Sequence, residues 1–432
     1  MVSDVFTPDC KLTPYWWDRS PRPELAEVAL PASVDVVVVG SGYTGLSAAL
    51  AVARAGRSTL VFDAEDAGWG CSTRNGGQIS TSIKPDYGTL ARRHGGEAAF
   101  AIIREGQNAL AWIGDFIAEE GIDCDFQVPG RFHAAHSPRH YERLARVIAS
   151  QPEGLAVPAH AVPRGDQRRE IGSDAYFGGV VFEKHACLDP GRFHQGLLEQ
   201  VLGAGASVMP HCPVTGIENN GTSHTLVTAR GSVHAREVIV ATNGYTGRLS
   251  PWQRRRVVSI GSYMIATEPL TTEVMDRVMP TDRIVSDTRR VVYYYRPSPD
   301  RTRILFGGRV TSGETDALRS GALLQRDLVR LFPELSGTRV SHSWMGFVAY
   351  TFDTLAHLGC HQGVHYAMGY CGSGVSMAAY LGTRVGQKVL GLAEGRTALD
   401  DVAFQTRPLY SGRPWFLAAP VAFYRCCDAL GL

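Results

Sequence analysis

The chain has 432 residues, of which 44% are hydrophobic and 20% charged, an ordinary composition for one large or two medium globular domains. Its formal net charge of +1 gives no indication of binding to nucleic acid or to an anionic membrane. No apolar run reaches the roughly 18 residues of a membrane helix, and residues 1–30 lack the basic and apolar regions of a signal peptide. The nine cysteines are scattered, which argues against a disulfide framework or a metal site. We therefore expect a cytoplasmic protein without a membrane span.

Residues 1–33 are expected to form an irregular arm that precedes the regular elements. Its aromatic cluster, residues 15–17, is most simply a hydrophobic anchor that holds the arm on the body of the protein. The alternative is that this cluster lines a binding site.

Residues 34–62 have the pattern of a βαβ unit. Residues 34–39 form a β-branched run, broken only by Asp35, that is typical of a strand buried on both faces in a parallel sheet. Residues 46–55 are rich in alanine and leucine and predict a helix, which Gly56 ends. A second strand is expected over residues 58–62.

Three glycines between the first strand and the helix indicate a dinucleotide. They have the G-x-G-x-x-G spacing, in which the first allows a tight turn, the second admits a pyrophosphate and the third lets the helix pack on the strand. The acid that ends the second strand can accept hydrogen bonds from a ribose. The alternative is a βαβ unit without a ligand. The expected contacts in this unit are Gly40, Gly42, Tyr43, Thr44, Gly45, Asp63 and Ala64.

A second glycine-rich segment, residues 68–78, follows this unit and reads G-W-G-C-S-T-R-N-G-G-Q. It can bring many backbone N–H groups against an extended ligand. An NAD site needs no such second loop, whereas a flavin dinucleotide that runs across the domain does. The segment thus favours FAD, and the expected contacts are Gly70, Cys71, Ser72, Arg74, Asn75, Gly76, Gly77 and Gln78.

The same segment resembles the G-W-G-A-S-x-R-N-G-G-Q motif of FAD-dependent amine oxidoreductases in the D-amino-acid oxidase superfamily. The most similar branch is the γ-glutamylputrescine oxidase-like group, of the iminodiacetate and sarcosine oxidase type. Cys71 stands where that motif usually has alanine. The resemblance implies a Rossmann-like FAD-binding domain with an inserted substrate domain.

Helices are expected over residues 86–120 and 141–148, with an extended segment over residues 123–135 between them. Asp189 and Pro190 then begin a helix that runs to about residue 202. Short strands are expected over residues 207–209, 214–218, 225–229, 233–235 and 238–241. The last of these ends in Thr242, Asn243 and Gly244, which resembles the family's strand that passes near the FAD, and Val214 is a further expected contact.

Residues 251–340 are interpreted as the second segment of the inserted domain. A long strand is expected over residues 257–267, with partners over residues 291–296 and 303–306. The run from Ile304 to Arg309 resembles the family's L-L-F-G-G-R, in a sheet that covers the reactive face of the flavin. The pocket candidates from this sheet are Tyr263, Tyr293, Tyr294, Tyr295, Arg296 and Arg309.

Residues 341–395 are expected to close the nucleotide domain, with a strand over residues 364–368 and a helix after a glycine-rich turn. A helix N-terminus suits the electron-rich end of a reduced flavin. The family has a similar G-[FY]-x-G-x-G segment there, and a plain turn is the alternative. The expected contacts are Gly346, Gly372, Ser373, Gly374, Val375 and Ser376. The tail, residues 401–432, docks on the body or mediates assembly.

These elements predict an α/β fold, α+β overall, in which a Rossmann-like FAD-binding domain carries an inserted antiparallel-sheet substrate domain. The FAD-binding domain is expected to comprise residues 1–85, 186–250 and 341–432. The substrate-binding domain is expected to comprise residues 86–185 and 251–340.

The candidate catalytic residues, which would contact the substrate, are Tyr263, Tyr295, Arg296 and Arg309. Arginine is the usual partner of a substrate carboxylate because its fork is bidentate, and we expect Arg309 in this role before Arg296 or Arg74. On strand alternation, Tyr293 and Tyr295 share one face and Tyr294 and Arg296 the other, so only one pair can face the pocket.

The chemistry expected from the resemblance is oxidation of a small amine or amino acid. Hydride transfer from the α C–H to flavin N5 gives an imine, which water hydrolyses to a carbonyl compound and a smaller amine or ammonia. This route requires no strong base. Four histidines are expected to be structural or at the surface, with help in deprotonating the amine as the alternative: His133, His185, His342 and His357.

Departures from the family's pattern refine this expectation. Val348 occupies the place of the cysteine that attaches FAD in sarcosine-oxidising relatives, so we expect non-covalent FAD, with Cys71 as the one alternative. Residues 304–306 lack the lysine that aids oxygen activation in those relatives. Ser376 replaces a lysine that binds their substrate carboxylate, so sarcosine is a poor candidate. Two arginines in the pocket would favour a dicarboxylic amine such as iminodiacetate.

The leading hypothesis is therefore an FAD-dependent amine oxidase that reduces O₂ to H₂O₂. One alternative is a dehydrogenase that passes electrons to a quinone or a carrier protein. Another is a flavin-binding subunit without turnover. The sequence gives no indication of the oligomeric state.

Overall fold

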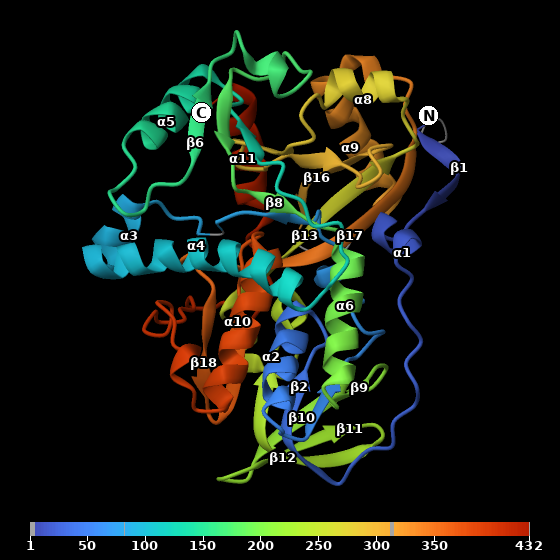
Figure 1. The fold of residues 1–432 in the computed structure, drawn as a ribbon, viewed down its shortest axis with the longest axis vertical. Helices are drawn as coiled ribbons and strands as arrows, with labels where there is room; N and C mark the ends of the chain where they lie inside the picture. Colours follow the sequence, from blue (N-terminus) through green and yellow to red (C-terminus); the bar gives the residue numbers. More distant parts are fainter. Residues whose placement is uncertain (1–4, 82, 312–314, 432) are drawn as a thin grey trace.

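The computed structural model describes residues 5–81, 83–311 and 315–431, without the side chains of Arg309 and Ala429. Two large sheets lie at opposite ends of the molecule, and helix α4 lies across the region between them (Figure 1). The helices are α1 (Tyr15–Arg19), α2 (Tyr43–Arg54), α3 (Tyr87–His94), α4 (Gly96–Glu119), α5 (Pro138–Ala149), α6 (Pro190–Gly203), α7 (Pro251–Arg254), α8 (Thr272–Val278), α9 (Ala317–Leu331), α10 (Gly374–Val389) and α11 (Ala418–Leu430). Among the described residues, no helix is long and apolar enough to cross a membrane.

The eight-stranded sheet contains the βαβ unit expected at the start of the chain. Strands β2, β3, β9, β12 and β19 pair in parallel, while β10, β11 and β18 add antiparallel pairs. Its strands are β2 (Ser33–Val39), β3 (Thr59–Phe62), β9 (Ser207–Met209), β10 (Val214–Asn219), β11 (His224–Thr228), β12 (Gly231–Val240), β18 (His357–His361) and β19 (Val364–Met368). Residues 233–235 and 238–241 were expected as separate strands, but the first and most of the second lie in β12.

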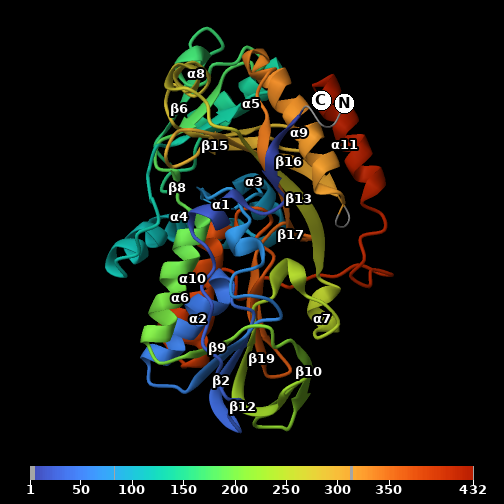
Figure 2. The ribbon, with the colours of Figure 1, turned by 90° about the vertical axis from the view of Figure 1, so that its right-hand side faces the viewer.

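Helices α2, α6 and α10 cover one side of this sheet (Figure 2). Four residues of β2, from Val36 to Val39, are buried, which explains the unbroken apolar run in the sequence. Helix α2 begins at Tyr43, earlier than the expected Leu46, and packs against α10. Asp189 caps α6 as expected, because its Oδ1 accepts hydrogen bonds from the backbone N–H groups of Gly191 and Arg192.

The nine-stranded sheet has the order β1-β17-β13-β16-β15-β14-β5-β7-β6. It was expected to be antiparallel and is largely so, but β1 pairs with β17 and β5 with β14 in parallel. Its strands are β1 (Phe6–Lys11), β5 (Arg131–Ala134), β6 (Ala159–Val162), β7 (Gly179–Phe182), β13 (Val257–Thr267), β14 (Ile284–Asp287), β15 (Tyr294–Pro297), β16 (Ile304–Thr311) and β17 (Val340–Thr351). A small third sheet pairs β4 (Gln78–Ile79) with β8 (Ala186–Cys187).

The packing of two segments differs from the expected domain ranges. Helix α4 was assigned to the substrate domain, but its apolar face joins the core of the eight-stranded sheet and its helices. Its buried Glu105 accepts a 2.6 Å hydrogen bond from the hydroxyl of Tyr380 in α10. Strand β17 was assigned to the FAD-binding domain, but it pairs with β13 along its whole length in the nine-stranded sheet. Amphipathic periodicity predicts that a face is buried and leaves open which layer covers it.

Candidate active site

A cavity of about 1220 Å³ is lined by residues of both large sheets and of the loops between them. It exceeds the roughly 300–1,000 Å³ of a pocket for a small ligand. The cavity brings together the glycine-rich segments expected from the sequence, and strands β13, β15, β16 and β17 contribute to its wall. The expected cofactor contacts that line it are Gly40, Gly42, Tyr43, Thr44, Asp63, Ala64, Gly70, Cys71, Ser72, Arg74, Asn75, Gly76, Gln78, Val214, Thr242, Asn243, Gly346, Gly372, Ser373, Gly374 and Val375.

Each of the three glycines of the first turn is required for a different structural reason. Gly40 has φ of +104°, which side chains rarely adopt. Gly42 caps the N-terminus of α2, and a Cβ there would stand 2.9 Å from the hydroxyl oxygen of Ser72. Gly45 packs against the turn itself, since its Cβ would stand 1.8 Å from the carbonyl oxygen of Gly40. The turn therefore holds α2 against β2, and residues 42–44 at the N-terminus of this helix line the cavity.

Asp63 at the end of β3 is held in a fixed orientation. Its Oδ2 accepts hydrogen bonds from the backbone N–H of Ser41 at 2.8 Å and from the Ser41 hydroxyl at 2.5 Å. The second oxygen, Oδ1, accepts a hydrogen bond from the N–H of Glu65. The carboxylate lies on the cavity wall, where its remaining lone pairs can accept hydrogen bonds from a ribose.

Aromatic side chains hold the loop over residues 70–78 in place by hydrogen bonds and ring contacts. The indole N–H of Trp16 donates to the carbonyl oxygen of Asn75, and that of Trp344 donates to the carbonyl oxygen of Arg74. The Arg74 guanidinium lies 4.7 Å from the Trp17 ring and 4.3 Å from the Trp69 ring. The arm is thus anchored by its aromatic cluster, as predicted, and Arg74 is held in a stack.

Four expected cofactor contacts do not line the cavity but support the residues that do. A Cβ at Gly45 would clash with the carbonyl oxygen of Gly40, and a Cβ at Gly77 would clash with that of Leu188. The carbonyl oxygen of Gly244 accepts a hydrogen bond from the Ser259 hydroxyl. Ser376 is buried inside α10. Direct contact with the cofactor at these four positions stays a prediction.

The substrate candidates Tyr263, Tyr295 and Arg296 do not line the cavity. Tyr263 and Tyr295 are fully buried in the core on the other face of the nine-stranded sheet. The Tyr295 hydroxyl bonds to that of Tyr176, while Arg296 donates to the carbonyl oxygen of Leu188 at 2.8 Å. The prediction for these residues is therefore corrected: strand alternation turns the tyrosines away from the cavity, and the arginine is held by hydrogen bonds to the carbonyl oxygens of Gly77 and Leu188. The side chain of Arg309 lies outside the described part of the chain.

Tyr294 is the tyrosine of this segment that faces the cavity. Its hydroxyl lies 3.0 Å from that of Ser262 on β13, which also lines the cavity. Burial raises the pKa of Tyr294 to about 12, so the hydroxyl stays protonated and can donate a hydrogen bond. Tyr293 faces the opposite way and packs against Phe306.

Several cationic and imidazole side chains of the cavity were not expected as a group. Lys84 follows the glycine-rich loop, Arg131 and His133 alternate along β5, and His185 precedes β8. His133 and His185 were expected to be structural, yet both line the cavity. The polar-apolar-polar order of residues 131–133 is a signal for one exposed strand face, but it does not say which cavity that face meets. His342 and His357 pair with Asp18 and Asp353 away from the cavity, as expected of structural residues.

Comparison with known proteins decides the family. A family model described as DAO, FAD dependent oxidoreductase, matches residues 35–387. The chain belongs to this family. It is 31% identical to the γ-glutamylputrescine oxidoreductase of Escherichia coli over 92% of this chain and 93% of that protein. It is 29% identical to a probable oxidoreductase of Rhizobium meliloti over 94% of each chain.

Solved structures share the fold of this FAD-dependent oxidoreductase. The glycine oxidase of Geobacillus kaustophilus is similar with a TM-score of 0.74 and 19% identity, over 88% of this chain and 99% of that chain. The iminodiacetate oxidase of a Chelativorans species is similar with a TM-score of 0.67 and 17% identity, over 87% and 98% of the two chains. The predicted combination of a nucleotide-binding sheet and a second sheet over the cavity is thus confirmed.

The residues of this oxidoreductase fit FAD. The cavity is lined by residues of the turn after β2, the loop over residues 70–78 and the turn before α10. The two helix N-termini, of α2 and α10, supply N–H groups and a positive partial charge for the phosphates and the ring carbonyls. Val348 lines the cavity, and a valine side chain cannot attach FAD covalently. Burial raises the pKa of the Cys71 thiol to about 11, so it holds no reactive thiolate at neutral pH.

Proposed function

We propose that the protein is an oxidase that cleaves the C–N bond of a small amine or amino acid, with non-covalent FAD and O₂ as the electron acceptor. The observation that carries the proposal is the wall formed by Tyr294, Ser262 and Val348 in the same cavity as the flavin-binding turns. The relatives named above are a γ-glutamylputrescine oxidoreductase, a glycine oxidase and an iminodiacetate oxidase. The nine free cysteines fit the predicted reducing cytoplasm, which remains a prediction.

When bound, FAD would supply the acceptor for a hydride from the carbon next to the amine nitrogen, and O₂ would then take up the two electrons with two protons to give H₂O₂. The amine loses this hydride and one proton to become an imine, which water hydrolyses. The protein must therefore bind the amine with a free lone pair and hold its C–H bond in place.

The charges around the cavity support binding of the neutral amine. Arg131 and Lys84 lie on its wall, and both disfavour a second positive charge on an ammonium group. Burial lowers the pKa of His133 to about 3, so this imidazole is neutral but too weak a base to take the proton. We propose that the amine gives up its proton to water, and that Tyr294 and Ser262 orient it by hydrogen bonds.

Arg309 on β16 remains our proposed partner for a carboxylate next to the reacting carbon, and an N-carboxymethyl amine such as iminodiacetate is a proposed substrate. The chain lacks a lysine at residues 304–306, so electron transfer to a quinone or a carrier is the competing outcome. A flavin-binding subunit without turnover is the other.

The test is the visible absorbance of the bound flavin during anaerobic addition of iminodiacetate, sarcosine, γ-glutamylputrescine and D- and L-amino acids. Bleaching by one of them, followed by recovery in air with peroxide, is the expected result. Bleaching without recovery in air would establish the dehydrogenase instead. If no amine bleaches the flavin, the proposed activity is wrong and the subunit without turnover is favoured.

A further inference from the structure

A basic pocket lies at the part of the cavity formed by β5, β14 and the segments before α3 and β8. We use this name for the side chains of Lys84, Arg131, His133 and His185, all of which line the cavity. Residues 131 and 133 point to the cavity side of β5, while Phe132 and Ala134 are buried in the core behind it. The cluster therefore combines a guanidinium, an ammonium and two imidazoles in one wall.

Among the described residues, the positive charges of this pocket have no counter-ion. Within the described part of the chain, no ion pair is formed by Lys84 or Arg131, whereas Arg283 and Arg289 are paired with Glu170 and Asp287. Asp287 is an acid on this wall, and it is already paired with Arg289 and with the N–H groups of Arg289 and Tyr293. Burial without a partner lowers the pKa of Arg131 to about 10. A buried cation without a partner is costly unless a ligand supplies the negative charge.

The Arg131 side chain is oriented for a ligand in the cavity. Its Nε donates a 2.8 Å hydrogen bond to the hydroxyl of Ser286 on β14, and the same hydroxyl lies 2.8 Å from Nδ1 of His133. This contact fixes the plane of the guanidinium and leaves both terminal nitrogens without a partner among the described residues. Both ring nitrogens of His185 also lack a hydrogen-bond partner there, while its ring stacks on Phe182 at 4.8 Å.

The basic pocket is set apart from Tyr294. In the sheet order, β15 carries Tyr294 and β5 carries Arg131, with β14 between them. Two strand spacings amount to about 10 Å. Lys84 extends the basic pocket toward the turn before α10. Its Nζ lies 5.8 Å from the ring centre of Tyr350, and the Tyr350 hydroxyl lies close to Gly372 in that turn.

We propose that the basic pocket binds a carboxylate of the amine substrate that is several bonds away from the C–N bond to be cleaved. The inference rests on the proposed function and names its substrate class: amines with a remote carboxylate, in preference to simple alkylamines. A carboxylate suits the planar fork of Arg131, with the ammonium of Lys84 as a second, point-like charge. Arg309 would then serve only substrates with a further carboxylate next to the reacting carbon.

The first test measures binding and needs no turnover. Hexanoate and its neutral isostere hexanamide are titrated into the FAD-loaded enzyme by calorimetry. We expect hexanoate to bind at least about tenfold more tightly, because its charge meets Arg131 and Lys84. Arg131→Met and Lys84→Met should each reduce this ratio severalfold, whereas Arg143→Met, which removes an exposed arginine of α5, should leave it unchanged. Equal affinities in the wild type, or an unchanged ratio in both pocket variants, would overturn the inference.

The second test separates the inference from the proposed function. Anaerobic flavin reduction is compared for 5-aminopentanoate and pentylamine, which differ in the terminal carboxylate. Faster reduction by 5-aminopentanoate, with the preference lost in Arg131→Met and Lys84→Met, is the expected result. Equal reduction by both amines would refute the remote carboxylate while the amine oxidase stands. If neither they nor the amines named above reduce the flavin, the proposed oxidase activity fails, and the hexanoate ratio still decides whether the pocket binds carboxylates.

Discussion

The ring of Tyr294 lies directly over Gly307 on the neighbouring strand, where a Cβ would stand 2.2 Å from the ring carbon Cζ. The two residues are register partners of β15 and β16. On another side, a Cβ at Gly76 in the flavin-binding loop would stand 3.3 Å from the same ring. Two glycines thus create the space that lets the tyrosine point into the cavity.

Replacement of Gly307 by alanine should displace this ring. The added methyl group overlaps Tyr294, and relief of such overpacking costs about 1–3 kcal/mol. We expect flavin reduction by the substrate to slow by about tenfold or more, since the hydroxyl at the cavity wall moves. Stopped-flow reduction measures the effect. Gly337→Ala is the control because its Cβ meets open space, and an equal loss in this variant would contradict the role of the Tyr294 contact.

Replacement of Gly45 by alanine should weaken FAD binding. The new Cβ would stand 1.8 Å from the carbonyl oxygen of Gly40, a backbone atom that cannot move without opening the turn. An overpacking cost of about 1–3 kcal/mol corresponds to a loss of affinity of about fivefold to 150-fold if it falls on the bound state. The flavin content of the purified protein and a titration of the apoprotein with FAD measure it. Gly203→Ala, in open space at the end of α6, should keep full flavin content.

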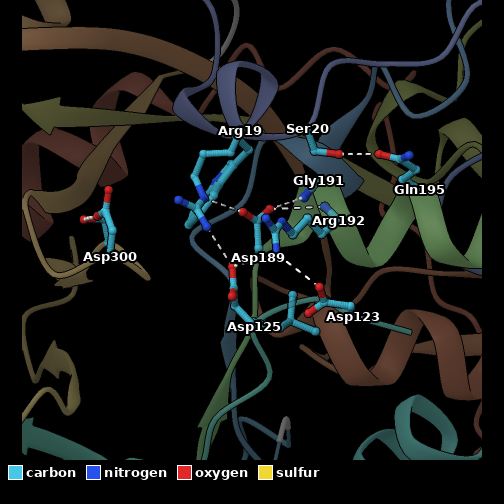
Figure 3. Close-up of polar contacts among 12 residues, drawn as sticks. Arg19, Ser20, Asp123, Asp125, Asp189, Gly191, Arg192, Gln195 and Asp300 are labelled. Atoms are coloured by element: carbon cyan, nitrogen blue, oxygen red, sulfur yellow. Dashed lines mark hydrogen bonds and ion pairs between the residues drawn. The ribbon is translucent and has the colours of Figure 1, made fainter. Parts of the chain in front are cut away.

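The ion pair between Arg19 and Asp189 should be a large contribution to stability. Figure 3 shows Arg19 reaching from the arm to both Asp189 and Asp125, with Asp189 also capping α6. Asp189 is completely buried, and its burial raises the pKa of the carboxyl group. Arg19→Met leaves this carboxylate without its cation, which we expect to cost about 3 kcal/mol.

The measurement for Arg19→Met is the urea midpoint of unfolding at neutral pH. The matched control is Arg277→Met, which breaks an exposed pair with Glu334 and should change stability by less than about 1 kcal/mol. Similar midpoints for the two variants would show that the buried ion pair contributes no more to stability than the exposed one.

Acidification should destabilise the protein in part through His136. Burial lowers the pKa of this imidazole from 6.5 to about 4, with help from the positive charges of His140 and Arg289. As the pH falls from about 6.5 toward about 4, the unfolded chain takes up a proton that the folded chain does not, so stability is lost. His136→Gln keeps a hydrogen-bonding side chain near Thr288 and removes this proton. Its urea midpoint should fall less than that of the wild type between about pH 7 and about pH 5. An equal fall in both proteins would contradict the prediction.

The cavity-lining residues of the first βαβ unit could be predicted because they are close together in the sequence. Gly40, Gly42 and Asp63 lie within one βαβ unit. The tight turn and the close approach of the backbone to a ligand require glycines at a fixed spacing, and the carboxylate follows the second strand at a characteristic distance in the sequence. The turn at Gly372 and Gly374 was predictable for the same reason, since glycines before a helix form a site with near neighbours in the chain.

The substrate wall could be predicted only as a segment. Alternation separated Tyr294 from Tyr295, but the choice of face depends on which side of the nine-stranded sheet meets the nucleotide-binding turns. The basic pocket joins residues from three distant segments, and no spacing connects Lys84, Arg131 and His185. Helix α4 shows the same limit, because its apolar stripe was evident and its partner α10 was not.

The cofactor, the family and the two kinds of sheet could be inferred from the amino-acid sequence, because backbone turns and buried strands are properties of short stretches of chain. Which side chains share the cavity became evident only from the folded chain. Contacts between distant segments depend on how layers stack and which strand faces meet, and these are settled by packing over the whole molecule.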